Sequence, residues 1–334
     1  MKVVRNTVWI VMLLLTTTSC EKLIFEDDLS ADERTTFDYL WNSCRDKYSY
    51  FRYKGISWDS VYAELSPQVE NGIGNDSLFK VLAKMLNSLE DGHVNLVSDF
   101  NVSSYPFRFD ANENYNDRIV EEYYLTADAY QTGPFRHNSI RNGRVAYIRY
   151  ATFSGTLNDE IEFIKAHYPN VDGFIIDVRS NGGGLMSNVT KLVNAFGSEE
   201  HVVYYTRNKI GAGENDFSEL GGVQMGSSNG FNKKVAVLTN RTSYSASSFF
   251  TLAMKTFDNV QVFGDTTGGG LGIPNGGQLP NGWTYRFSVT QTFDIDGYIW
   301  ENGVPTDVQL TLDPAAENNN TDNIIDAAAD WITL

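Results

Sequence analysis

The sequence contains few cysteines and few histidines. Among its 334 residues, two are cysteine (Cys20 and Cys44) and four are histidine. Two cysteines are too few for a disulfide framework, and Cys44 has helical spacing with Phe37 and Leu40, which favours a buried structural thiol over a catalytic one. The motifs of zinc sites, such as His-Glu-x-x-His or a cysteine cluster, are missing. We therefore expect no metal ion and no other cofactor.

Basic residues are also scarce. The chain has 26 Lys and Arg against 42 Asp and Glu, which gives a formal net charge of -16. Because a surface that binds nucleic acid must be basic, we expect no nucleic-acid partner. Three glycines at 182–184 follow an apolar run, but neither a Lys-Ser/Thr pair nor a Gly-x-Gly-x-x-Gly spacing accompanies them, so nucleotide binding is not favoured. Their bare backbone would instead let a substrate approach closely.

The start of the chain lacks an apolar run long enough to span a bilayer. Lys2 and Arg5 are followed by the apolar residues 8–15, which are too few for a transmembrane helix. A basic start and a short apolar core are typical of a targeting segment. We therefore expect residues 1–20 to be a signal peptide and the protein to be exported.

Small residues lead to Cys20 at the end of this segment. The sequence Thr16-Thr-Thr-Ser-Cys20 resembles a bacterial lipobox, although Thr17 stands where such signals usually carry an aliphatic residue. The resemblance implies that Cys20 is lipidated, that residues 21–29 form a tether, and that the lipid holds the protein on a membrane of the bacterial cell envelope. The alternative is an ordinary secretory signal with a coincidental cysteine.

Helical patterns dominate residues 30–90. The sequence Ser30-Ala-Asp-Glu33 has the form of a capping box, and further helix starts are predicted near Ser57 and Asp76. We therefore expect a small helical N-terminal cap over residues 30–90, followed by a core over residues 91–334.

Strand and helix patterns alternate between residues 144 and 264. This alternation predicts an α/β layer with parallel strand pairings. Residues 100–143 indicate an irregular connection with a weak strand signal at 119–125, and residues 211–230 indicate a glycine-rich connection. The other predicted elements are strands at 144–150, from 173, at 202–206, 235–239 and 283–293, and helices at 157–168, 188–196, after 245 and at 322–332.

The segment from Val235 to Met254 carries the densest group of hydroxyls. Its apolar start predicts a buried strand and its end predicts a helix, so the turn between them places backbone N–H groups at a helix start. A serine in such a turn could be a nucleophile beside an oxyanion site, or the hydroxyls could merely cap the helix. The hydroxyl residues are Thr242, Ser243, Ser245, Ser247 and Ser248.

His93 lies between a predicted helix end and a predicted strand at 94–97. A histidine in that place is a positioned side chain, and the alternative is a favourable interaction with the helix dipole. The other histidines, His137, His167 and His201, lie in polar segments and are expected to be exposed.

Five motifs follow one another along the chain. They are Leu89-Glu-Asp-Gly-His93, Asp177-Val-Arg-Ser-Asn-Gly-Gly-Gly184, Thr239-Asn-Arg-Thr-Ser-Tyr-Ser-Ala246, Gly264-Asp-Thr-Thr-Gly-Gly269 and Gly303-Val-Pro-Thr-Asp307. In this order and spacing they resemble the S41 family of serine peptidases, the C-terminal processing and tricorn-like proteases. The resemblance covers residues 35–334 and implies a crotonase-like α/β core of ββα units with a small helical cap.

The resemblance implies a nucleophile and its activating base. Aligning Ser245-Ala246 with the Ser-Ala step of the family makes Ser245 the nucleophile. The tail-specific branch activates this serine with a lysine, but Gly270 stands at that position here, and Lys255 is about 15 Å along the predicted helix. The tricorn-like branch uses a histidine, and the matching residue is His93.

The same branch recruits a glutamate near the last strand, and Glu301 stands at the matching place. Its implied role is to orient the imidazole of His93 and stabilise its cation, directly or through an intermediary. Asp177 and Arg179 are expected to be structural and to tie the glycine loop in place. The implied oxyanion donors are the backbone N–H groups of Gly183 (or Gly182) and Ala246.

We therefore expect a serine endopeptidase that cleaves peptides or unfolded proteins. Residues 100–143 are too short for the PDZ domain found in many tail-specific members, so recognition of a substrate C-terminus through such a domain is not implied. Two alternatives remain open from the sequence. The chain could be a catalytically inactive protein that binds peptides or apolar ligands on the same fold, or an esterase or amidase that uses the same residues on small molecules.

Overall fold

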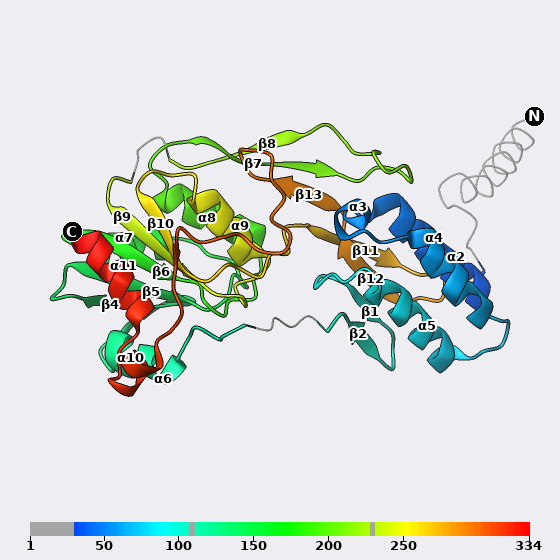
Figure 1. Cartoon of the computed structure of the whole chain (residues 1–334), viewed down its shortest axis with the longest axis horizontal. Helices are drawn as coiled ribbons and strands as arrows, with labels where there is room; N and C mark the ends of the chain where they lie inside the picture. Colours follow the sequence, from blue (N-terminus) through cyan, green and yellow to red (C-terminus); the bar gives the residue numbers. More distant parts are fainter. Residues whose placement is uncertain (1–29, 107–110, 228–230) are drawn as a thin grey trace, which may run out of the picture.

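The computed structural model describes residues 30–106, 111–227 and 231–334 (Figure 1). The expected signal peptide, the expected lipidation site Cys20 and the expected tether at 21–29 lie outside these residues. Within the described ranges, no helix has both the length and the apolar character needed to cross a membrane. The N-terminal helices and the largest sheet lie at opposite ends of the molecule in Figure 1.

The described residues begin with a run of helices that pack their apolar faces together. In α5, for example, Leu78 and Leu82 recur at helical spacing and both are buried. Asp32 caps the first helix by accepting a hydrogen bond from Thr35 N, so the predicted N-cap at Ser30 is wrong. The elements are α2 (Glu33–Lys47), α3 (Phe51–Lys54), α4 (Trp58–Leu65), η2 (Ser66–Gln68) and α5 (Asn75–Asn87).

A four-stranded antiparallel sheet packs against these helices. Its strand order is β11-β12-β1-β2, so strands from two distant parts of the chain lie side by side. Leu96 pairs with Tyr285, and both are buried in the same apolar cluster as the helices, together with Cys44 as predicted. The strands are β1 (Asn95–Val97), β2 (Val102–Ser104), β11 (Pro274–Gln278) and β12 (Thr284–Ser288).

A seven-stranded mixed sheet forms the other end of the molecule. Its order is β14-β10-β9-β6-β5-β4-β3, and its neighbours run parallel from β5 to β14 and antiparallel from β3 to β5. Strands β5 and β6 are buried along their whole length, as expected where both faces of a parallel sheet are covered. The strands are β3 (Tyr130–Thr132), β4 (Phe135–Ile140), β5 (Val145–Tyr150), β6 (Gly173–Asp177), β9 (Lys234–Thr239), β10 (Val260–Gly264) and β14 (Val308–Gln309).

Helices cover both faces of this sheet. Side chains of β9 alternate between the two faces: Val235 and Val237 belong to one apolar cluster, and Ala236 and Leu238 belong to the other. The first cluster contains α7 (Glu160–His167), α8 (Met186–Phe196) and α9 (Ala246–Met254). The second contains α6 (Asp117–Ile119), the π-helix η3 (Val120–Leu125) and α11 (Asn323–Thr333), which is red in Figure 1.

A small third sheet changes two predictions. Its order is β13-β7-β8, with β13 (Thr290–Phe293), β7 (His201–Asn208) and β8 (Gly221–Met225). The single strand predicted at 283–293 is wrong, because the chain leaves one sheet after β12 and enters this one at β13. Strand β8 lies in the stretch predicted to be a glycine-rich connection. A short helix, α10 (Pro314–Asn318), precedes α11.

The strand signal at 119–125 is also wrong, because these residues form α6 and η3. Val120 and Tyr124 are four residues apart and both are buried against the large sheet, which is a helical spacing. The side chain of Asn116 accepts a hydrogen bond from Ile119 N and caps the segment. Packing has therefore overridden the strand preference of its β-branched and aromatic residues.

The expected exposure holds for His167 but not for His137. The imidazole of His137 is fully buried on β4, with Nε2 2.9 Å from Thr132 Oγ1 and Nδ1 2.8 Å from Tyr168 Oη. Burial lowers the pKa of His137 to about 4, and His167 adds to the shift. His201 is half-buried.

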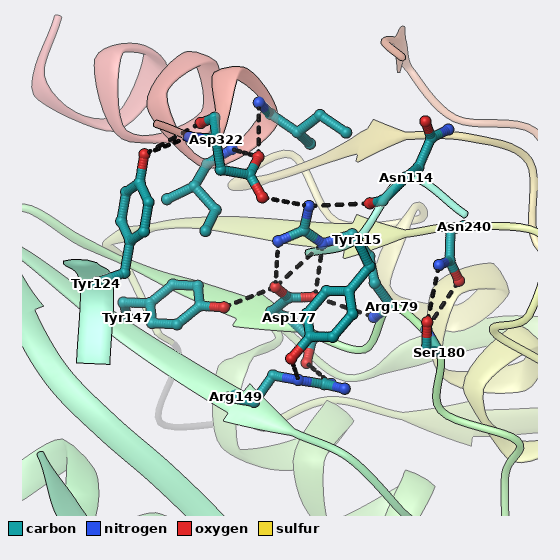
Figure 2. Close-up of polar contacts among 12 residues, drawn as sticks. Asn114, Tyr115, Tyr124, Tyr147, Arg149, Asp177, Arg179, Ser180, Asn240 and Asp322 are labelled. Carbon is teal, nitrogen blue, oxygen red and sulfur yellow. Dashed lines mark hydrogen bonds and ion pairs between the residues drawn. The ribbon is translucent and has the colours of Figure 1, made fainter. Parts of the chain in front are cut away.

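A buried ion-pair cluster fastens β6 to α11 (Figure 2). Arg179 donates to both carboxylate oxygens of Asp177, and its Nη1 donates to Asp322 Oδ2 at 2.8 Å. Asp322 in turn caps α11. Burial opposes the charged form of Asp177, but the charge of Arg179 outweighs it and holds the pKa of that carboxyl below its usual range. The pair secures the start of the loop at 180–184, which is the structural role predicted for it.

The substitution Arg179→Met should lower the free energy of unfolding by about 3–5 kcal/mol, because it leaves two buried carboxylates without their cation. The control Arg118→Met removes an exposed pair with Glu122 and should cost about 0–1 kcal/mol. Urea unfolding followed by tryptophan fluorescence measures both. Equal losses for the two variants would contradict a stabilising role of the buried cluster.

Candidate active site

Three loops meet at one edge of the seven-stranded sheet. Strands β6, β9 and β10 are parallel neighbours, so their carboxyl ends lie at the same edge. The glycines 182–184 follow β6, Ser245 follows β9, and residues 269–271 follow β10. A backbone hydrogen bond from Ser245 N to Gly269 O, 2.9 Å long, joins two of these loops. The predicted nucleophile therefore lies at the edge of the sheet where these three loops meet.

Ser245 has a strained backbone. Its φ is 56° and its ψ is -118°, a combination that costs a non-glycine residue about 1–3 kcal/mol and that is found most often at functional sites. Ser245 immediately precedes α9, and the first N–H groups of a helix have no acceptor within the helix. The strained turn therefore presents the half-buried Ser245 hydroxyl beside the start of α9, where the N–H of Ser247 donates to Tyr244 O at 3.1 Å and the N–H of Ala246 lies next to the hydroxyl in the chain.

The other hydroxyls of this turn hold the turn together. Ser243, Ser247 and Ser248 are fully buried, so they are poorly placed to meet a substrate. Each of these serines, and Thr242 as well, makes a hydrogen bond within or next to the turn. The hydrogen bonds run from Ser243 Oγ to Val178 O (2.8 Å), from Ser247 Oγ to Asn181 O (2.8 Å), from Ser248 Oγ to Thr267 Oγ1 (2.9 Å) and from Thr242 Oγ1 to Asn240 Oδ1 (3.0 Å).

His93 comes from the N-terminal part of the fold and faces Ser245. It stands between α5 and β1, and its Nε2 lies 3.0 Å from Ser245 Oγ across 152 residues of sequence. Its backbone is held on both sides, because His93 N donates to Asp91 Oδ1 at 2.8 Å and Arg286 Nε donates to His93 O at 3.1 Å. The structure thus brings together the serine and the histidine that the sequence predicted.

The surroundings of His93 favour its neutral form. Burial lowers the pKa of His93 below its usual range. The carboxylate of Asp91 opposes this shift, whereas the positive charges of Arg286 and Lys54 add to it. A neutral imidazole can accept the proton of the Ser245 hydroxyl, which a general base must do.

Two side chains without a predicted role face the second ring nitrogen of His93. Ser288 Oγ lies 3.4 Å from Nδ1, and Asp91 Oδ1 lies 3.7 Å from it. Asp91 belongs to the same motif as His93, two residues before it, and this proximity is the signal that could have identified it. Ser288 is 195 residues away, and the sequence holds no sign that it would approach the histidine.

Glu301 is buried beside the loop after β10. Its Oε2 accepts a hydrogen bond from Leu271 N at 2.7 Å, and its backbone oxygen accepts one from Gly270 N at 2.9 Å. Burial and the negative charge of Asp91 raise the pKa of Glu301 to about 8. Among the hydrogen bonds and ion pairs of the described residues, none joins Glu301 to His93, so Glu301 does not orient the imidazole by a direct hydrogen bond.

The predicted oxyanion donors lie around Ser245. A Cβ on Gly183 would be 2.9 Å from both Ser245 Cβ and Ala246 N, and its φ is +101°, so only glycine fits there. The N–H of Gly183 donates to Asn181 Oδ1 at 2.9 Å, so an oxyanion would have to replace that acceptor. Gly182 is exposed, and Ala246 is the first residue of α9.

The arrangement supplies the parts needed for acyl transfer. A hydroxyl faces a neutral histidine, and a helix start offers N–H groups to a developing negative charge. Over the ranges that the structure describes, no group of three or more His, Cys, Asp or Glu side chains is placed to hold a metal ion.

Comparison with known families identifies the family of this chain. The model of peptidase family S41 matches residues 144–310, and the model of the tricorn protease C1 domain matches residues 30–87. The chain belongs to peptidase family S41. The family resemblance read from the five motifs is thereby confirmed.

Relatives of this S41 chain include proteins of known sequence and structure. A probable CtpA-like serine protease of Staphylococcus epidermidis is 28% identical over 174 residues, which cover 51% of this chain and 34% of that protein. The chain thus matches about a third of that relative's length. The crystal structure of a candidate peptidase from Parabacteroides merdae is 33% identical with a TM-score of 0.83, covering 91% of this chain and 98% of that one. Mature CPAF shares the fold, with a TM-score of 0.62 at 10% identity over 90% of this chain and 95% of that one. These likenesses confirm the predicted fold class.

Gly270 stands where the tail-specific branch has its lysine, and the space beside it is occupied by another side chain. Gly270 has a φ of +72°, and a Cβ there would overlap the ring of Tyr244. The same ring packs on His93, with the ring centroids 5.1 Å apart. Tyr244 therefore occupies the space that a side chain at residue 270 would need, and it flanks the histidine instead.

The substitution Gly270→Ala should destabilise the protein by about 1–3 kcal/mol more than Gly297→Ala, because overpacking is added to the cost of a left-handed backbone. Gly297 is the matched control, since its φ is +88° and a Cβ there meets nothing within 4 Å. Chemical unfolding measures the difference. Equal stabilities would show that Tyr244 moves aside freely.

Proposed function

We propose that this S41 family member is a serine endopeptidase with Ser245 as nucleophile and His93 as general base. The observation that carries the proposal is the 3.0 Å contact between His93 Nε2 and Ser245 Oγ on a strained helix-start turn. Two groups in hydrogen-bond reach, one a base and the other a nucleophile, are the signature of nucleophilic catalysis.

The proposed reaction follows from the positions of the groups. His93 Nε2 takes the proton of Ser245 as Oγ bonds to the scissile carbonyl carbon, and the backbone N–H of Ala246, with that of Gly182 or Gly183, holds the oxyanion. The imidazolium then gives its proton to the leaving nitrogen as the C–N bond breaks. Water repeats the sequence on the acyl-enzyme and frees Ser245. Glu301 contributes by holding the loop at 269–271, to which the backbone of Ser245 is bonded.

The proposed substrates are peptides or unfolded proteins. Support comes from family membership and from the names of the relatives, which include a probable serine protease and a candidate peptidase. A small-molecule esterase and an inactive binding protein are the alternatives that the experiments must separate.

A fluorophosphonate probe should label the wild-type protein at Ser245. Ser245→Ala should abolish labelling, and His93→Ala should slow it about 10²–10⁴-fold, the usual contribution of a general base. Ser243→Ala is the matched control in the same turn and should still label, because its hydroxyl is buried on Val178 O. Labelling rates by gel fluorescence, with thermal unfolding to confirm folding, measure this. Labelling that survives Ser245→Ala would contradict the assignment, and an unlabelled wild type would favour a binding protein.

A second assay separates peptidase from esterase. The wild-type protein should cut unfolded casein into fragments with new N-termini, and Ser245→Ala should leave casein intact. Mass spectrometry of the products identifies the cleaved bonds. Hydrolysis of a simple ester without any cleavage of casein would support the esterase.

We also propose that the protein is exported and anchored in the bacterial cell envelope by a lipid on Cys20, on the strength of the segment Thr16-Thr-Thr-Ser-Cys20. The full chain expressed in a bacterium should enter the detergent phase of Triton X-114, because acyl chains bury in the micelle. Cys20→Ser should move it to the aqueous phase, and Cys44→Ser is the control that should not. Equal partitioning of wild type and Cys20→Ser would remove the lipid anchor.

A further inference from the structure

The protonation pattern of His93 requires an acceptor at its second nitrogen. To take a proton from Ser245, Nε2 must be unprotonated, so the proton of the neutral ring resides on Nδ1. The residue that accepts a hydrogen bond from Nδ1–H fixes the tautomer and the direction of the ring. The identity of this acceptor therefore decides whether the 3.0 Å contact with Ser245 is productive.

Ser288 is within hydrogen-bond distance of Nδ1, and Asp91 is within ion-pair distance of it. Ser288 Oγ, at 3.4 Å from Nδ1, can turn its own hydrogen toward Gly272 O, 3.3 Å away, and so present a lone pair to the ring. Asp91 Oδ1 is 3.7 Å from Nδ1, and the Asp91 side chain is fully buried. Asp91 Oδ2 has no hydrogen-bond partner and no contact with solvent. A buried carboxylate oxygen without a partner is costly, and a positive charge on His93 would lower that cost.

Glu301 serves a different part of the site. Its side chain and its backbone oxygen hold the N–H groups of Leu271 and Gly270, and the adjacent Gly269 O accepts the N–H of Ser245. Glu301 thus braces the loop that supports the nucleophile. Burial and Asp91 raise its pKa to about 8, so at neutral pH it is a neutral acid with little ability to stabilise an imidazolium.

We propose that Asp91, assisted by Ser288, is the positioning residue that orients His93 and stabilises its cation, and that Glu301 braces the Ser245 loop. The proposal rests on the proposed function of Ser245 and His93. The other charged groups near the ring are Arg286, whose Nε donates to His93 O, and Lys54, whose Nζ donates to Glu90 O at 2.7 Å. Neither can accept a hydrogen bond from Nδ1–H, so Asp91 is the negatively charged group that faces this side of the ring.

The test compares the rate of fluorophosphonate labelling against pH in three variants of the full protein. Wild type should show an acidic limb with a midpoint below 6.5, the ordinary value of histidine, because burial lowers the pKa of His93. Asp91→Asn keeps an oxygen for the backbone N–H of His93 but removes the charge. It should slow labelling about 10²–10⁴-fold, as the loss of a triad carboxylate does, and move the limb to lower pH, because an anion that favours the imidazolium is gone.

Two variants give the contrast. Glu301→Gln imitates the neutral acid, so its loss of rate should be at least about tenfold smaller than that of Asp91→Asn, with the acidic limb unmoved. Asp258→Asn changes an exposed carboxylate past the far end of α9 and should label at the wild-type rate. A larger loss for Glu301→Gln than for Asp91→Asn, or an unmoved limb in Asp91→Asn, would overturn the proposal.

Nitrogen-15 NMR of the histidines gives a readout that does not depend on activity. At neutral pH the wild-type His93 should carry its proton on Nδ1, and Asp91→Asn should shift the ring toward the Nε2 tautomer. A wild-type ring protonated on Nε2 would overturn the role of Asp91. If the wild type fails to label yet shows the Nδ1 proton and its loss in Asp91→Asn, the proposed function fails while the orienting role stands.

Discussion

The parallel pairing of β6, β9 and β10 is the constraint on which the site depends. Parallel neighbours end at the same edge, so a glycine loop, a strained serine turn and the Gly269–Leu271 loop come together although they are far apart in sequence. The strain at Ser245 is tolerated because its neighbours are fixed on every side, by the hydroxyl bonds of the turn and by the hydrogen bond to Gly269 O.

The site also depends on a second part of the fold, which holds His93 in place opposite Ser245. His93 lies between a helix and a strand of the four-stranded sheet, and that sheet takes half its strands from residues 274–288. Because β1 pairs with β12, Arg286 and Ser288 stand beside the histidine. The chain therefore builds the histidine's surroundings from two segments that close on each other only when the whole protein folds.

Three buried carboxyl groups have different electrostatic surroundings. Asp177 is paired with Arg179 and remains charged, which fastens β6 to α11. Glu301 is buried and has no cation within ion-pair distance among the described residues, and its pKa rises. Asp91 Oδ1 accepts the backbone N–H of His93 and lies 3.7 Å from His93 Nδ1, whereas its Oδ2 has no hydrogen-bond partner. The same functional group, a carboxyl, thus has three different surroundings, each set by its nearest donors and charges.

The sequence alone determined the family and the α/β class, and it predicted Ser245 and His93 as nucleophile and base, because local apolar patterns and short motifs carry that information. It predicted β5, β6, β9 and α11 well, since continuous apolar runs and helical spacing have few alternative readings. It was wrong at residues 119–125, where packing against a sheet overrides strand preference, and at residues 283–293, where the chain passes from one sheet to another. It was also wrong for His137, which is buried because β4 pairs with a strand on each side. Only the tertiary structure decided which groups face the second nitrogen of His93, where Glu301 lies and why residue 270 excludes a side chain. Each of these depends on contacts between residues far apart in the chain, and no local pattern encodes such distances.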